Sequence, residues 1–157
     1  MKHVTTGDSG LPPDLTLAGT VVADDRLGWS RELCDEFEAN AFNGRVGGCL
    51  RSETDHVRVW EIRLAPGERL PVHRHVLDYF WTAVTAGRSR QHTSDGTTRD
   101  VVYERGESRH FTFGSGEYLL HDLENTGATT LVFTTVEFKE GSNPPLPLQD
   151  QGADERS

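Results

Sequence analysis

The chain has 157 residues and a formal net charge of −9 at pH 7, because 25 acidic residues outnumber 16 Lys and Arg. This length is typical of one domain that buries its own core. The acidic balance leaves no basic surface to attract phosphates, so we expect neither a nucleic-acid nor a membrane partner. A small-molecule substrate or another protein is the expected partner.

Features that report on cellular compartment indicate a cytoplasmic protein. The two cysteines, Cys34 and Cys49, lie outside any CxxC arrangement, which favours a reducing compartment. The first thirteen residues lack the apolar region of a secretory signal. No segment approaches the ~18 consecutive apolar residues that spanning a bilayer requires.

Both ends of the chain are predicted to be flexible. Residues 1–13 and 141–157 are rich in Gly, Pro, Ser and acidic residues, which cannot bury enough apolar surface to offset the entropy of ordering. Between them we place one domain at residues 14–140. The sequence PPLPL at residues 144–148 is either part of this flexible segment or lies extended across a neighbouring surface or subunit.

One short helix is predicted in the N-terminal extension of this domain. Residues 30–42, SRELCDEFEANAF, place Leu33, Phe37 and Phe42 near helical spacing behind a serine N-cap. Before the helix, the sequence LTLAGTVVA at residues 15–23 is compatible with a strand.

Almost everything after the helix has the pattern of β-strands. Short runs of alternating or β-branched residues are separated by turns that contain Pro-Gly, Asp-Gly, Arg-Gly and Asn-Thr-Gly. The runs occupy residues 57–64, 70–87, 88–94, 97–103, 108–113, 116–121 and 129–138. This pattern predicts an all-β sandwich or barrel.

Two histidines, His73 and His75, lie one residue apart in one of these runs. Side chains at i and i+2 of a strand point to the same face, so both imidazoles could meet at one point inside a barrel. Imidazole is a ligand for Fe, Cu, Zn and Ni. The spacing alone is weak evidence, because composition would produce a His-x-His in such a chain with a probability of roughly 0.25.

The residues around the pair form a more specific pattern. Gly67, His73, His75 and Gly87 spell G-x5-H-x-H-x11-G, and His121 begins a later H-x3-N. On these motifs the sequence resembles the cupin family. The sequences of these motif segments are similar to those of small bacterial cupins, a group that includes members assigned to β-alanine degradation.

The resemblance covers residues 57–139 and implies a cupin jelly roll, the double-stranded β-helix. It also implies that His73, His75 and His121 converge on a divalent metal inside the barrel. Related small cupins commonly pair through sheet edges, and pairing removes exposed edges, so we expect a homodimer.

Two features depart from the family pattern. The metal-binding glutamate that usually follows the second histidine is replaced by Phe80, or by Tyr79 in the other alignment. The usual Pro-x-Gly of the second motif is also altered, because Gly114 and Gly116 stand seven and five residues before His121.

Three interpretations of the missing glutamate stay open. The histidines could form a three-histidine site that leaves coordination positions open for a substrate and O2. Asp78 could reach back as a fourth ligand. In the third interpretation the metal has been lost and the barrel only binds a ligand.

Strand alternation predicts which side chains form the wall of the site. If His73 and His75 face inward, Pro71 should face inward with them. An irregularity near Asp78 would then exchange the inward-facing and outward-facing positions of the following strand. The side chains predicted to point inward are Phe80, Thr82 and Val84, and those predicted to point outward are Tyr79 and Trp81. A slip of register would instead turn the Tyr79 hydroxyl toward the metal.

Further residues are candidates for the substrate pocket. Arg58 shares a strand face with Trp60 and other apolar residues, which is an unusual place for an arginine, so it could clamp a substrate carboxylate beside Trp60. His110, in the run SRHFTF, is another pocket candidate. Asn125 is expected to have a structural role, holding the turn after its strand.

The leading functional prediction is a metal-dependent cupin enzyme that acts on a small, anionic or keto-bearing molecule. An oxygenase using Fe(II) and O2 is favoured, with Zn, Ni, Mn and Cu as alternative metals. A second hypothesis is a non-redox lyase, isomerase or cyclase with Tyr79 or Asp78 as the base. A third is a non-catalytic cupin that binds a small molecule.

Overall fold

The helix and strands of the protein follow the order expected from the sequence, except that Cys49–Glu53 form a strand that the sequence patterns did not predict. The computed structural model describes residues 10–148, within which the chain forms one helix and ten strands. Their bounds are β1 (Thr20–Ala23), α2 (Arg31–Ala39), β2 (Cys49–Glu53), β3 (Val57–Leu64), β4 (Arg69–His75), β5 (Tyr79–Ala83), β6 (Gly87–His92), β7 (Thr98–Tyr103), β8 (Ser108–Phe111), β9 (Leu119–Asn125) and β10 (Leu131–Phe138). The terminal segments predicted to be flexible fall in large part outside the described residues.

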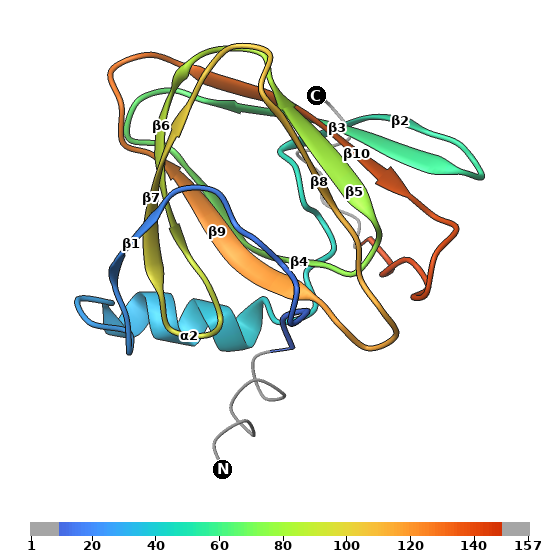
Figure 1. Cartoon of the computed structure of the whole chain (residues 1–157), viewed down its shortest axis with the longest axis horizontal. Coiled ribbons are helices and arrows are strands. Elements are labelled where there is room, and N and C mark those ends of the chain that lie inside the picture. The colour runs from blue at the N-terminus through green and yellow to red at the C-terminus, as the bar shows by residue number, and fades with distance from the viewer. Residues whose placement is uncertain (1–9, 149–157) are drawn as a thin grey trace.

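Two antiparallel sheets of five strands each face one another across a common interior (Figure 1). The strand order is β1-β7-β6-β9-β4 in the first sheet and β2-β3-β10-β5-β8 in the second. Six of the eight neighbouring pairs join strands that are not consecutive in the chain, as in a jelly roll. The predicted all-β jelly-roll fold is therefore confirmed.

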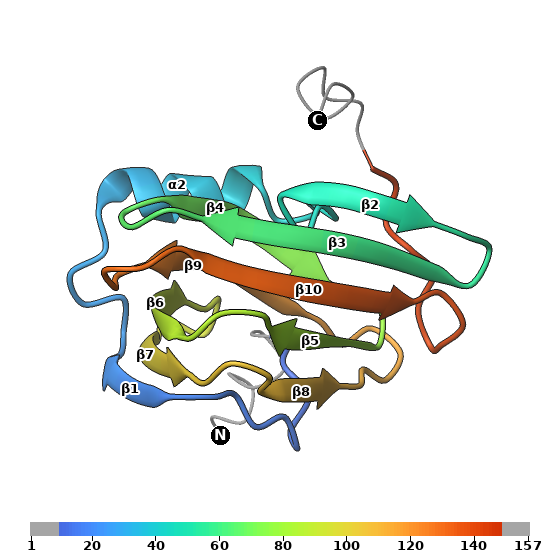
Figure 2. The same ribbon diagram turned by 90° about the horizontal axis from the view of Figure 1, so that it is seen from above.

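Helix α2 begins where the sequence predicts and ends before Phe42. Ser30 caps its first turn, since Oγ accepts a backbone N–H at 3.0 Å. Phe37 packs against Val72 of β4, so the helix covers the outer face of the first sheet (Figure 2). Phe42, which the spacing placed on the apolar face, follows the helix and is exposed. No helix in the described part of the chain is long and apolar enough to cross a membrane.

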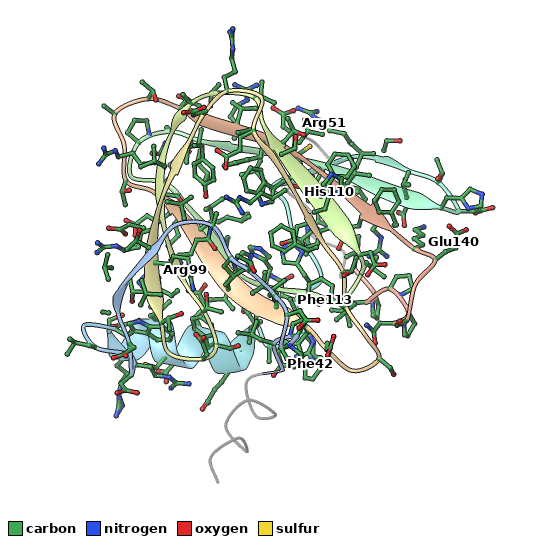
Figure 3. All side chains as sticks on the ribbon, in the orientation of Figure 1. Phe42, Arg51, Arg99, His110, Phe113 and Glu140 are labelled. Carbon is green, nitrogen blue, oxygen red and sulfur yellow. The ribbon has the colours of Figure 1, made fainter. Side chains whose placement is uncertain are left out.

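Side chains from both sheets fill the interior of the barrel (Figure 3). The largest buried cluster consists of Ile62, Leu64, Leu70, Ala83, Val101, Tyr103, Leu123, Leu131 and Phe133. A second cluster surrounds Tyr79 and Phe111, and leucines of the N-terminal extension pack against it. Burial of these apolar side chains is the main source of stability for such a fold.

A bulge in β4 decides which of its side chains face the interior. The strand advances three residues from Leu70 to His73 while its partner β9 advances only two. Leu70, His73 and His75 are therefore all buried inside, and Pro71 is exposed. The prediction that Pro71 faces inward is wrong because the bulge reverses the alternation between residues 70 and 73.

The segment after β10 lies along the barrel as far as residue 148. Asn143 Nδ2 donates hydrogen bonds to two loop carbonyls, at 3.0 and 3.1 Å. Arg58 Nη1 donates to the carbonyl of Leu146 at 3.2 Å. The PPLPL sequence therefore contacts the surface of its own chain.

Candidate metal centre

Strands β4 and β9 bring three histidines together inside the barrel. His73 stands directly opposite His121 in the strand register, and His75 follows on the same face of β4. The three ring centroids are 4.7 to 5.2 Å apart. One ring nitrogen of each histidine lies within 4.8 Å of those of the other two. These are the three residues that the cupin resemblance implied as ligands.

Burial keeps the three imidazoles neutral. The loss of hydration lowers the pKa of His73 to about 4. The pKa values of His75 and His121 also lie well below 6.5, first because of burial and then because the neighbouring histidines would repel a second positive charge. A neutral imidazole keeps a free lone pair at pH 7, which is the form that binds a metal.

Hydrogen bonds orient two of the rings. Nδ1 of His73 donates to the carbonyl of Pro71 at 2.8 Å, and Nδ1 of His121 donates to the side-chain carbonyl of Gln91 at 2.8 Å. Each bond leaves Nε2 as the free nitrogen. The buried Nδ1 of His75 has no partner among the described residues, and this ring is held by stacking on Tyr79.

The donor set fits a divalent transition metal. Three neutral nitrogens are available, and within residues 10–148 no carboxylate or thiol joins the group. The unpartnered Nδ1 of His75 is a buried polar atom, which is costly unless another group binds it. A site of this kind leaves the positive charge of the ion uncompensated by protein ligands.

A cavity of about 40 Å³ adjoins the histidines and has room for roughly three water molecules. Besides the three histidines, its wall is formed by Val46, Ile62, Leu70, Tyr79, Trp81, Gln91, Tyr103, Leu123, Phe133 and Thr135. Most of these side chains are apolar, and none carries a charge. The cavity is therefore a small and largely apolar chamber beside the ligands.

Gln91 is a functional residue that the sequence analysis missed. It accepts a hydrogen bond from His121 and donates one to the hydroxyl of Tyr103 at 3.3 Å. Tyr103 in turn bonds to Ser89 at 2.8 Å. In the sequence, Gln91 is one polar residue in the polar run RSRQHTS, and only the pairing of β6 with β9 places it behind a ligand.

The prediction of which β5 side chains face the interior is wrong. Tyr79 and Trp81 line the cavity, whereas Phe80, Thr82 and Val84 lie on the outer face of the second sheet. Alternation continues through the turn without the expected break, since β5 pairs with β10 in a register that puts its odd-numbered side chains inside. Phe80 and Thr82 are therefore not pocket residues, and of the two candidates for the position of the family's glutamate it is Tyr79 that faces the cavity.

Tyr79 lies between two aromatic neighbours. Its ring stacks on His75 with the centroids 4.0 Å apart and on Phe111 with the centroids 4.6 Å apart. Burial, with the charge of Glu137 as a smaller cause, raises the pKa of Tyr79 well above 10. The hydroxyl stays protonated, so Tyr79 can donate a hydrogen bond but is unsuited to the role of base.

Asp78 does not reach the site. Its Oδ1 accepts the backbone N–H of Phe113 at 2.9 Å, and its carbonyl accepts that of Phe138 at 2.8 Å. The carboxylate ties the turn before β5 to the loop after β8, and it is not part of the histidine group. The predictions of Asp78 as a fourth ligand or a base are wrong.

Arg58 and Trp60 are buried but do not line the cavity. Arg58 Nε donates to Glu53 at 3.1 Å, and Trp60 Nε1 donates to Glu137 at 2.9 Å. Burial raises the pKa of Glu137 to about 7, against the hydrogen bond from Trp60 and the charge of Arg58. The assignment of Arg58 and Trp60 to the substrate pocket is wrong, because both side chains are bound to glutamates and neither lines the cavity.

His110 is exposed on the outer face of the second sheet. It pairs with Phe80 across β8 and β5, and the two ring centroids are 5.1 Å apart. The inward-facing residue of β8 is Phe111, which belongs to the buried cluster around Tyr79. The prediction of His110 as a pocket residue is therefore wrong.

Asn125 holds the turn at the end of β9. Its Oδ1 accepts the N–H of Gly127 at 2.9 Å, and its Nδ2 donates to the carbonyls of Leu64 and Thr129 at 2.9 and 2.8 Å. The buried amide thus links the turn after β9 to the end of β3. Such a link stabilises the strand that carries His121.

The structure is similar to solved cupin structures. A cupin domain from Bordetella pertussis Tohama I aligns with a TM-score of 0.51 and 29% sequence identity, over 57% of this chain and 88% of that one. A double-stranded β-helix protein from Klebsiella pneumoniae subsp. pneumoniae MGH 78578 aligns with a TM-score of 0.48 and 20% identity, over 65% and 82% of the two chains. No protein-family model and no curated protein matches the sequence.

Proposed function

Because the chain is a small cupin whose barrel gathers three buried histidines, we propose that it is a metal-dependent enzyme acting on a small molecule. The observation that carries the proposal is the group His73, His75 and His121, three neutral nitrogen donors with no carboxylate. A divalent ion held there would supply an electrophilic centre with positions open to a substrate and O2. We favour Fe(II), and hence an oxygenase.

The residues around the histidines prepare the site for this chemistry. Pro71 and Gln91 hold two of the rings in the tautomer that presents Nε2. The largely apolar wall lowers the local dielectric constant, which strengthens electrostatic interactions inside the cavity. Tyr79 adds a protonated hydroxyl at the wall.

A second reaction class is supported by the position of Tyr79. In a lyase, isomerase or cyclase, its hydroxyl would donate a proton or a hydrogen bond to a substrate oxygen. No carboxylate lines the cavity to serve as the base. The non-redox class would then require Zn, Ni or Mn in place of iron.

Elemental analysis of protein purified without a polyhistidine tag tests the proposal. We expect about one divalent ion per chain, lost in His73→Ala and in His121→Ala. His110→Ala is the matched control, because His110 is an exposed histidine and should leave the metal content unchanged. Iron would favour the oxygenase, and zinc, nickel or manganese the non-redox class. Wild-type protein that binds no metal would overturn the proposal.

A further inference from the structure

Two hydroxyl groups in the wall of the cavity lack a hydrogen-bond partner. Tyr79 and Thr135 lie on the neighbouring strands β5 and β10, and both side chains line the cavity. They are only 3% and 2% exposed. Within residues 10–148 neither hydroxyl makes a hydrogen bond. Neither oxygen is among the fully buried atoms that lack a partner, so both are open to the cavity and available to a ligand there.

Two other uncharged polar side chains of the wall already have partners. Gln91 is bound between His121 and Tyr103, and the Tyr103 hydroxyl is bonded further to a serine of β6. Apart from the three histidines, the polar groups of the wall without a hydrogen bond among the described residues are the hydroxyls of Tyr79 and Thr135 and the indole N–H of Trp81. The two hydroxyls lie on neighbouring strands.

The wall offers no charge to a ligand. Among the described residues, no Lys, Arg, Asp or Glu lines the cavity. Arg58, the arginine expected to clamp a carboxylate, is engaged with Glu53 and with the carbonyl of Leu146. The positive charge that a ligand would meet is therefore that of the metal ion, which three neutral histidines leave uncompensated. The wall itself would contribute hydroxyl groups and no charge.

We propose that the hydroxyls of Tyr79 and Thr135 bind an oxygen atom of the substrate, and that the substrate is a small, mainly apolar molecule. The cavity, with room for roughly three water molecules, limits the part of the substrate that it holds to a few non-hydrogen atoms. Short keto or hydroxy acids meet these conditions. This inference rests on the proposed function, because the substrate is to bind beside the metal.

The test uses the full chain loaded with Co(II), whose visible absorption changes when a ligand approaches the ion. Pyruvate is the probe. We expect pyruvate to shift the cobalt bands saturably as its concentration rises. Tyr79→Phe and Thr135→Val should keep their cobalt, and each should weaken pyruvate binding about 3- to 10-fold.

Thr134→Val is the matched control, since Thr134 precedes Thr135 on β10 and does not line the cavity. It should bind pyruvate as the wild-type protein does. If both cavity variants bind pyruvate with wild-type affinity, or if pyruvate leaves the cobalt spectrum unchanged, the inference is overturned while the metal site stands. A wild-type protein that takes up no cobalt would overturn the proposed function and this inference with it.

Discussion

The side-chain carbonyl of Gln91 accepts a hydrogen bond from Nδ1 of His121 at 2.8 Å. The two residues belong to β6 and β9, which pair within the first sheet. The bond places the proton of the imidazole on Nδ1 and leaves Nε2 free. The geometry of one proposed metal ligand therefore depends on a glutamine that makes no contact with the ion itself.

Replacing Gln91 by leucine should weaken metal binding about 10- to 100-fold, because His121 loses the acceptor that orients its ring. Gln91→Glu should lose much less of its metal affinity, since a carboxylate can still accept the hydrogen bond from Nδ1 of His121. Competition for Zn(II) against a chromophoric chelator measures both affinities. Equal affinities of Gln91→Leu and the wild-type protein would contradict the orienting role.

A glutamate at residue 80, one of the two positions that the family motif allows, should not supply a fourth ligand. Phe80 lies on the outer face of the second sheet, so the carboxylate of Phe80→Glu would point to solvent. We expect the dissociation constant for Zn(II) to change by no more than about twofold. Markedly tighter binding would show that residue 80 faces the metal after all.

Substitution of Asp78 should affect stability and not the metal. Asp78→Ala removes the acceptor of the Phe113 N–H, which should lower the free energy of unfolding by about 1–3 kcal/mol. The metal content should stay at the wild-type value, because the carboxylate lies outside the histidine group. Urea unfolding and elemental analysis of the same preparation check both outcomes. Loss of metal from a folded variant would argue for direct coordination.

Glu137 should make stability depend on pH in a defined direction. Its pKa is raised from 4.5 to about 7 in the folded protein. Its contribution to the free energy of unfolding is therefore fully present below pH 4.5 and is lost as the pH rises to about 7. At about 1.4 kcal/mol per pH unit, the loss amounts to at most about 3 kcal/mol. Glu137→Gln keeps an acceptor for Trp60 and cannot ionise.

The difference in unfolding free energy between Glu137→Gln and the wild-type protein isolates this effect from other titrating groups. We expect the free energy of unfolding of the variant to rise relative to that of the wild-type protein between pH 5 and pH 8. Urea unfolding of metal-free protein at each pH measures both values. The groups that face Glu137 are Trp60 and Arg58 of β3, Tyr79 of β5 and Glu53 of β2. A difference that does not vary with pH would mean that Glu137 is already ionised at pH 5.

The sequence by itself determined the fold class, the single helix and the three histidines. Strand alternation and turn residues are local properties, so the runs at residues 57–64 and 129–138 predict β3 and β10 closely. The spacing of His73 and His75 is also local, and the family motifs connected the pair to His121. Nothing in these inferences requires knowledge of which strands pair.

Only the tertiary structure decided which side chains form the wall of the site. The bulge in β4 turned Pro71 outward, and the unbroken alternation into β5 placed Tyr79 inside where Phe80 was expected. A shift of one residue moves every following side chain to the other face, and sequence alternation does not record where such a shift occurs. The contact of Gln91 with His121 joins residues 30 positions apart, so it exists only because β6 and β9 become neighbours when the barrel closes.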